Sequence, residues 1–423
     1  MSRLHDSASD RYESNELIVA LHYVDEVQYR LRARGIGTNQ PQVSAALGLA
    51  RVQLEPIPGE SRSEYRDLEA EAVAPQSAAI FNIDAIVREL RAEFSGRYGK
   101  WTPTIGKNRL IGHVGNHSVA EITGAGEVTF GGSGVPVNSS PQALLPRGTG
   151  PGRGARVGVA DTRLVPQPWA SGGWVARYSD RVPLASPTPA IAGHATFITG
   201  LVLFQAPGAT VEVRRLLDDD GLANSWAAAN RIVEFAGSGI DVLCLSFACY
   251  TDDGRPPLAL ATAIDRLDPG IVVVAAAGNH AHMAEPSTLP PAWPAALDDV
   301  IAVGAATDDS GEPADFSPSA PWVDVLAVGV GVTSTYLDGR VSVPVDPDKP
   351  TGKKVEQQFG GFATWDGTSF AAASVTGAIA AGVVPGQVTA RESWENIRTT
   401  LRGSPGGRGQ DGQAPFLPLV LPH

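Results

Sequence analysis

The sequence predicts an α/β fold with a central, mainly parallel sheet, preceded by a small N-terminal α+β domain. Beyond residue 155, strand-like runs of Val, Ile, Leu and Ala alternate with helix-like segments. These runs are apolar throughout, as expected of parallel strands buried on both faces with helices as crossovers. Before that point, short strand-like stretches accompany an amphipathic helical pattern at 81–94.

The composition supports a globular protein and argues against a nucleic-acid partner. The chain has 423 residues, enough for one large and one smaller domain, with 43% hydrophobic and 18% charged residues. The formal net charge is −12. Binding to phosphate backbones needs a basic surface, which this charge does not favour.

Neither the N-terminus nor the cysteines point to export or to a membrane. The first fifteen residues, MSRLHDSASDRYESN, contain no apolar stretch of the kind found in secretory signals. The longest apolar runs are much shorter than a membrane span. Cys244 and Cys249 lie in or beside one apolar run, so we expect buried free thiols. A cytoplasmic location is therefore expected, with secretion by another route left open.

Composition shifts along the chain predict five segments. We expect a disordered tail, an N-terminal α+β domain, a linker rich in Gly, Pro and Ser, the α/β domain, and a C-terminal extension of that domain. Their ranges are 1–14, 15–131, 132–154, 155–385 and 386–423.

Within these segments, individual elements follow from apolar periodicity and from Gly or Pro boundaries. In the N-terminal domain we expect a strand at 17–24, a helix at 25–35, an apolar stretch at 45–54, a helix at 81–94 and short strands at 109–131. In the α/β domain we expect strands at 155–161, 210–217, 241–247, 270–279 and 299–306, and helices at 194–205, 225–239 and 258–267.

Polar side chains occur at or near the ends of three predicted strands. Asp161 and Asn279 each end a strand, and Ser246 lies late in another. Sites in open parallel sheets form beyond the carboxyl ends of the strands. Each residue alone is a weak signal, because Asp and Asn also favour strand-terminal turns for local reasons.

Two further residues narrow the search for a site. His194 opens a helix-like segment between small neighbours, whereas His280 and His282 form a pair that we interpret as loop histidines rather than metal ligands. Ser369 lies in GTSFAAASVTG. Taken alone, that segment fits a serine N-cap as well as it fits a nucleophile at a helix start.

The order of the polar groups distinguishes these alternatives. Asp161, His194, Asn279 and Ser369 follow one another at separations of 33, 85 and 90 residues. In this order, VADT, GHATFITG, AAAGN and DGTSFAAASVTG resemble the Asp, His, oxyanion Asn and Ser motifs of subtilisin-like serine proteases, the subtilase family. The resemblance covers about 150–385 and implies a subtilisin-like three-layer fold.

The resemblance implies a role for each matched residue. Ser369 would be the nucleophile, His194 the general base and Asp161 the group that orients the imidazole. Asn279 would donate to the oxyanion together with the Ser369 backbone N–H. The substrate would be a protein or peptide, and no cofactor is required.

The resemblance also implies where the peptide binds. Ser246, Phe247 and Ala248 would line one wall of the first pocket, and the apolar Phe247 suggests a hydrophobic residue there. The acidic run 218–220 could add negative charge near other subsites, although a solvated turn is the simpler interpretation. No metal ligands are predicted. The sequence neither supports nor excludes structural calcium.

The chain departs from the family pattern at Arg163, Ala195, Asp366 and Ala373. None of these removes a reactive group, although the methyl of Ala195 stands beside the catalytic ring. Two alternatives therefore remain: a catalytically inactive binding protein, and a peptide-maturation or transpeptidase enzyme of the same fold. The N-terminal domain is expected to be either a propeptide-like inhibitor or a retained regulatory domain.

Overall fold

The computed structural model describes most of the chain and divides it into two compact units. The described residues are 4–6, 10–57, 80–113, 149–181, 188–281, 289–344, 354–403 and 414–419. The N-terminal unit contains Met1–Leu110, Asn224–Val233 and Tyr250–Arg266, and the central-sheet unit contains Ile111–Ala223, Glu234–Cys249 and Leu267–His423.

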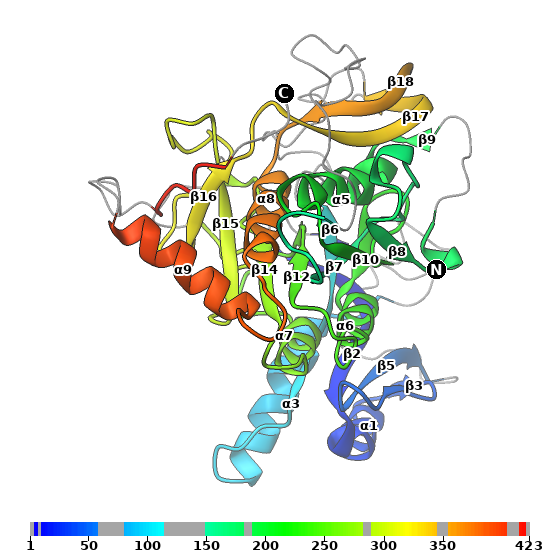
Figure 1. Cartoon of the computed structure of the whole chain (residues 1–423). Helices are drawn as coiled ribbons and strands as arrows, with labels where there is room; N and C mark the ends of the chain where they lie inside the picture. Colours follow the sequence, from blue (N-terminus) through cyan, green and yellow to red (C-terminus); the bar gives the residue numbers. More distant parts are fainter. Residues whose placement is uncertain are drawn as a thin grey trace. The chain divides into compact units, whose positions relative to one another are not determined.

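The central-sheet unit is built on seven strands in the order β16-β15-β14-β12-β7-β10-β8. Every described pairing within this sheet is parallel (Figure 1). The strands are β7 (Arg156–Asp161), β8 (Trp174–Ala176), β10 (Thr210–Arg215), β12 (Val242–Leu245), β14 (Val272–Ala276), β15 (Val300–Ala306) and β16 (Val325–Val328). The prediction of a mainly parallel α/β sheet is confirmed.

Two buried helices cover one face of this sheet and pack against each other. α5 (His194–Gln205) contacts β7 and β10, whereas α8 (Thr368–Ala381) contacts β12, β14, β15 and β16. A Cβ at Gly377 of α8 would lie 2.7 Å from the Cβ of Gln205 on α5. The helices therefore meet so closely that only glycine fits there. α9 (Ala390–Gly403) packs against α8.

A second, smaller sheet completes this unit. β17 (Val332–Pro344) and β18 (Lys354–Trp365) form a long antiparallel pair, and β9 (Thr188–Pro189) pairs with β17 in parallel. Ser334 and Thr335 of β17 donate side-chain hydrogen bonds to carbonyl groups of Phe197 and Thr196 on α5. These bonds fix the long strand pair against the first turns of α5.

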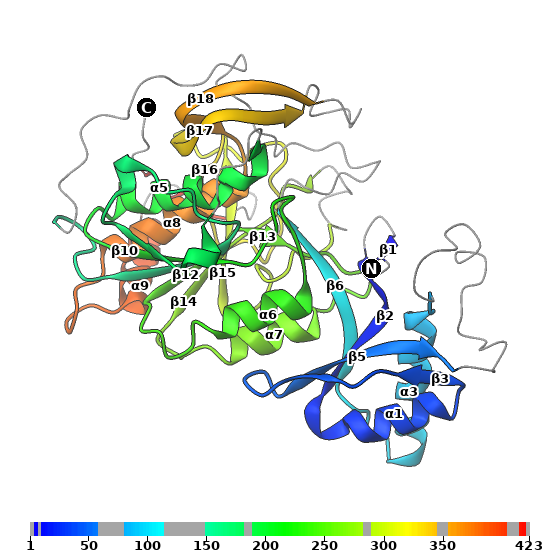
Figure 2. The same cartoon turned by 90° about the vertical axis from the view of Figure 1, so that its right-hand side faces the viewer.

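The N-terminal unit packs two helices on one face of an antiparallel sheet (Figure 2). Alternating residues of β2 and β5 join α1 and α3 in one apolar cluster, which includes Leu17, Val52, Leu31 and Phe94. The unit's elements are β1 (Leu4–Asp6), β2 (Arg11–Ala20), α1 (Val24–Arg32), β3 (Ile36–Thr38), β4 (Gln42–Ser44), β5 (Leu49–Pro56), α3 (Ile83–Arg97), α6 (Ser225–Val233) and α7 (Leu258–Asp265).

One strand runs through both units. β6 (Ile105–His113) pairs with β2 in the N-terminal unit, and its last residues belong to the central-sheet unit. There, β6 runs antiparallel to β13 (Phe247–Ala248) and also neighbours β11 (Leu222–Asn224). Its expected continuation as short strands to residue 131 lies outside the described residues.

Two expectations about element boundaries are corrected. The predicted disordered tail 1–14 contains β1 and the start of β2, which pair with each other. The helix expected at 225–239 ends at Val233, and Gly237 and Gly239 adopt positive φ beyond it. Most of the predicted linker lies outside the described residues. None of the helices within the described ranges is both long enough and apolar enough to span a membrane.

Candidate active site

A carboxylate and an imidazole are paired at the carboxyl end of β7. Asp161 is the last residue of β7, and His194 is the first residue of α5. The Nδ1 atom of His194 lies 2.8 Å from both carboxylate oxygens of Asp161. Both side chains are fully buried. A buried carboxylate needs hydrogen-bond donors, and the Thr162 N–H supplies a second one to Asp161 Oδ1 at 2.6 Å.

The substitution of Ala195 for the usual glycine leaves this pair intact. The backbone N–H of Ala195 donates to Thr162 Oγ1 at 3.1 Å, which ties the start of α5 to the segment that carries Asp161. Thr196 Oγ1 accepts from the backbone of Val165 in the same segment. The close contacts of His194 with Asp161 therefore coexist with the extra methyl group.

Ser369 lies on the first turn of α8, next in sequence to a residue whose ring contacts the imidazole. The ring of the next residue, Phe370, is 5.6 Å from the ring of His194. The Oγ of Ser369 lies 3.5 Å from the carbonyl oxygen of Ser246, and the Ser246 hydroxyl donates to the Ser369 carbonyl at 3.3 Å. The fold therefore brings Asp161, His194 and Ser369, which are far apart in sequence, to one edge of the sheet.

The side-chain amide of Asn279 has a fixed orientation. Thr368 donates its backbone N–H to Asn279 Oδ1 at 3.0 Å and its hydroxyl to the same oxygen at 2.9 Å. The N–H of Gly278 donates to that hydroxyl oxygen, so the hydroxyl proton points toward Asn279. Because a backbone N–H can only donate, Asn279 must present its oxygen to Thr368. Its Nδ2 then lies next to Gly367 and can donate toward the start of α8.

The oxyanion role that the sequence predicts for Asn279 can be tested with leucine in its place. On that role, kcat for peptide hydrolysis should fall by about 10²–10³-fold with little change in KM, because such a donor acts mainly in the transition state. The change is measured by steady-state hydrolysis of a peptide substrate. Asn230→Leu is the matched control, since that side chain only donates to the Trp226 carbonyl within α6. An Asn279→Leu variant with wild-type kcat would contradict the role.

The predicted peptide-binding strand is already paired in this structure. Ser246, Phe247 and Ala248 are all buried, and Phe247 and Ala248 lie opposite His113 and Gly112 of β6. A segment from the N-terminal part of the chain therefore runs antiparallel along the edge where a peptide is expected. The sequence analysis missed this arrangement, because the residues of β6 carry no distinctive motif.

One carboxylate of the acidic run 218–220 is paired with two arginines. Asp219 forms ion pairs with Arg163 at 3.3 Å and with Arg215 at 3.1 Å. Asp218 accepts hydrogen bonds from the backbone N–H groups of Asp220 and Leu222. This local bonding supports the simpler interpretation of a solvated turn. It also gives the unusual Arg163 a charged partner.

The two cysteines and His280 are buried in the protein interior. Cys244 and Cys249 are buried free thiols, as predicted, and burial raises the pKa of Cys244 to about 11. Burial lowers the pKa of His280 to about 4, and its Nε2 donates to the Pro290 carbonyl at 2.9 Å. His282 lies outside the described residues. Within the described ranges, no group of three His, Cys, Asp or Glu residues could hold a metal ion.

Comparison with known proteins places this geometry in context. The model of the subtilase family (Peptidase S8) matches residues 152–411. Subtilisin DY of Bacillus licheniformis is 35% identical over 156 residues, which are 34% of this chain and 54% of that protein. Thermitase of Thermoactinomyces vulgaris is 29% identical over 267 residues, which are 60% of this chain and 81% of that protein. The chain spans only about a third to a half of the first curated relatives it matches.

A solved structure shares the fold over nearly the whole chain. Fervidolysin from Fervidobacterium pennivorans, described as a keratinolytic enzyme related to subtilisin, superposes with a TM-score of 0.57 at 16% identity. The match covers 98% of this chain and 61% of the other. At this identity the likeness concerns the fold, and the subtilisin-like fold class predicted from the sequence is confirmed.

Proposed function

Because the chain belongs to the subtilase family, we propose that it is a serine endopeptidase that cleaves proteins or peptides through Asp161, His194 and Ser369. The observation that carries the proposal is the close pairing of His194 Nδ1 with Asp161 beside the first turn of α8. The oriented amide of Asn279 at the same helix start adds a donor where an oxyanion would form.

Each residue then has a defined chemical task. His194 Nε2 accepts the proton of the Ser369 hydroxyl while Oγ bonds to the substrate carbonyl carbon. The Asn279 amide and the N–H at the start of α8 donate to the oxygen that becomes negative. The tetrahedral intermediate collapses, His194 protonates the departing amine, and water later hydrolyses the acyl ester. Asp161 holds the imidazole tautomer that allows these transfers.

The proposal is tested with the wild-type chain and a fluorophosphonate probe, which reacts only with an activated hydroxyl. We expect covalent labelling that mass spectrometry maps to the peptide containing Ser369, together with hydrolysis of a peptide library. Denatured protein serves as the control, because it keeps the serine but loses its activation. Absence of labelling on folded wild-type protein, both uncut and after proteolytic removal of the N-terminal region, would favour the inactive binding protein. Aminolysis products that outweigh hydrolysis in the presence of an added amine would favour the transpeptidase.

We further propose that the N-terminal region inhibits this site in the uncut chain. The support is the position of Gly112, which lies opposite Ala248 on the expected peptide edge. An extended segment that adds to a sheet edge binds mainly through its backbone, so it competes with any substrate that uses the same edge. This favours the propeptide-like inhibitor over the alternative of a retained regulatory domain.

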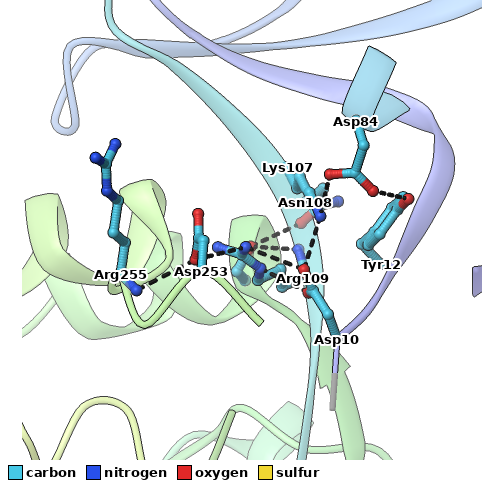
Figure 3. A network of polar contacts seen from close by, with 9 residues as sticks. Asp10, Tyr12, Asp84, Lys107, Asn108, Arg109, Asp253 and Arg255 are labelled. Carbon is cyan, nitrogen blue, oxygen red and sulfur yellow. Dashed lines mark hydrogen bonds and ion pairs between the residues drawn. The ribbon is translucent and has the colours of Figure 1, made fainter. Parts of the chain in front are cut away.

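A buried polar network holds β6 within the N-terminal unit (Figure 3). Arg109 pairs with Asp10 through two bonds, at 2.8 and 3.2 Å, and with Asp253 at 3.2 Å. Asn108 Oδ1 accepts from the Ser225 hydroxyl and from the Trp226 N–H at the start of α6. The contacts with Asp253, Ser225 and Trp226 join the strand to segments in the family-matched part of the chain, whereas Asp10 precedes that part.

Loss of this network is expected to activate the uncut chain. Of the two acidic partners of Arg109, only Asp253 lies in the family-matched part of the chain, and Asp253 is half-exposed. Loss of such a pair costs at most about 1 kcal/mol, so Arg109→Leu should raise the initial rate of peptide hydrolysis by about twofold to fivefold. The rate is measured before any cleavage is visible on a gel. Arg51→Leu is the control, because Arg51 pairs only with Glu16 among the described ion pairs. An equal rise in both variants would contradict inhibition through β6.

A further inference from the structure

An aromatic ring from the β17–β18 pair contacts the imidazole of the proposed general base. The ring centroid of Trp365, the last residue of β18, lies 5.4 Å from that of His194. The two ring planes meet at 80°, the edge-to-face geometry that aromatic pairs prefer. Trp365 is 1% exposed, so this contact is made away from solvent.

The contact supplies a restraint that Asp161 does not. The carboxylate holds the imidazole at one atom, Nδ1, from which both of its oxygens are 2.8 Å away. A ring held at one edge can still tilt about that edge, and tilting moves Nε2 away from Ser369. The near-perpendicular Trp365 ring packs against the imidazole and opposes that tilt. A misplacement of about 1 Å at a reacting group can cost about 10²-fold in rate.

Other rings hold Trp365 itself in place. Its ring lies 5.7 Å from Phe197 on α5, 5.9 Å from Tyr336 on β17 and 5.1 Å from Phe370 on α8. Its backbone is paired with Val332 in the β17–β18 register. The orientation of the indole is therefore set by α5, α8 and the smaller sheet together.

We propose that Trp365 is a positioning residue that fixes the plane of the His194 imidazole, and so directs Nε2 toward the Ser369 hydroxyl. The inference rests on the proposed function for its effect on rate. The geometric part stands separately, because ring orientation can be measured without turnover. Through Trp365, the β17–β18 pair contacts the imidazole of His194 directly.

The test compares Trp365→Leu, which removes the ring, with Trp365→Phe, which keeps one. We expect Trp365→Leu to lower kcat by about tenfold to a hundredfold with KM changed less than about twofold, and Trp365→Phe to stay within about threefold of wild type. The proton on His194 Nδ1 is followed by NMR. Its exchange with solvent should quicken in the Leu variant and remain slow in the Phe variant.

Phe359→Leu is the matched control. Phe359 is also buried on β18 and contacts Tyr336 at 5.0 Å, so two rings, Tyr336 and Trp365, separate it from His194. Thermal unfolding of every variant is measured first, and Trp365→Met replaces Trp365→Leu if the latter does not fold. Wild-type kcat and slow proton exchange in the ringless variant would overturn the proposal, as would an equal loss in Phe359→Leu. If the wild type cleaves no peptide, the proposed function fails, while the exchange measurement still decides the positioning role.

Discussion

Replacing Ser369 with alanine is expected to lower kcat for peptide hydrolysis by roughly 10⁶-fold and to abolish fluorophosphonate labelling. The hydroxyl is the only group at this position able to form the acyl-enzyme bond. Its single described hydrogen bond, to the Ser246 carbonyl, is long at 3.5 Å. Its loss should therefore change the free energy of unfolding by no more than about 1 kcal/mol.

A second buried serine on the same helix provides the control for this result. Ser374 also lies on α8, five residues after Ser369, and is fully buried. Ser374→Ala should keep both hydrolysis and labelling. Thermal unfolding of both variants is compared with that of wild type. Residual hydrolysis above about 1% in Ser369→Ala would exclude Ser369 as the nucleophile.

Asp161→Asn is expected to lower kcat by about 10⁴-fold at neutral pH without loss of the fold. The Thr162 N–H already donates to Asp161 Oδ1, so an amide at this position keeps its oxygen there. The amide nitrogen then replaces Oδ2, 2.8 Å from His194 Nδ1, and donates to that atom. The imidazole is left with its proton on Nε2, where it cannot accept the proton of Ser369.

The opposite end of the same strand offers a matched control. Asp241 accepts a hydrogen bond from the backbone N–H of Arg156, the first residue of β7, at 2.8 Å. Asp241→Asn removes a charge and keeps the acceptor, but it does not touch the imidazole. Steady-state kinetics of both variants should show the loss only in Asp161→Asn. A wild-type rate in Asp161→Asn would remove Asp161 from the proposed mechanism.

The strands and buried helices of the central-sheet unit were predicted well, because their apolar sequence patterns match their burial in the structure. The helix expected at 194–205 matches α5, and the strand expected at 299–306 matches β15 to within one residue. Both are continuous runs of small or apolar residues with polar or glycine boundaries. Elements of this kind carry the same pattern whichever neighbours they pack against.

The first part of the N-terminal strand, before the predicted start at residue 17, was missed because its polar residues are buried. β2 begins at Arg11; Asp10 directly before it and Glu16 within it are at most 5% exposed. Asp10 pairs with Arg109, and Glu16 accepts from Asn108, both on β6. A polar segment resembles a disordered tail when its hydrogen-bond partners lie about ninety residues away, because the sequence of the segment itself contains no sign of those partners.

The sequence by itself determined the family and the central sheet, and it predicted Asp161, His194, Asn279 and Ser369 as the site residues, because short motifs specify both a reactive group and the backbone that presents it. Only the tertiary structure decided which way the Asn279 amide faces, which ring packs on His194, and what lies along the edge formed by Phe247 and Ala248. The ring contact of His194 and the strand pairing of Phe247 and Ala248 both join segments that are far apart in the sequence. The N–H that orients the Asn279 amide also comes from a distant segment, since Thr368 of α8 lies 89 residues later. Such pairings have no local periodicity or turn signal, since they exist only once the chain has folded.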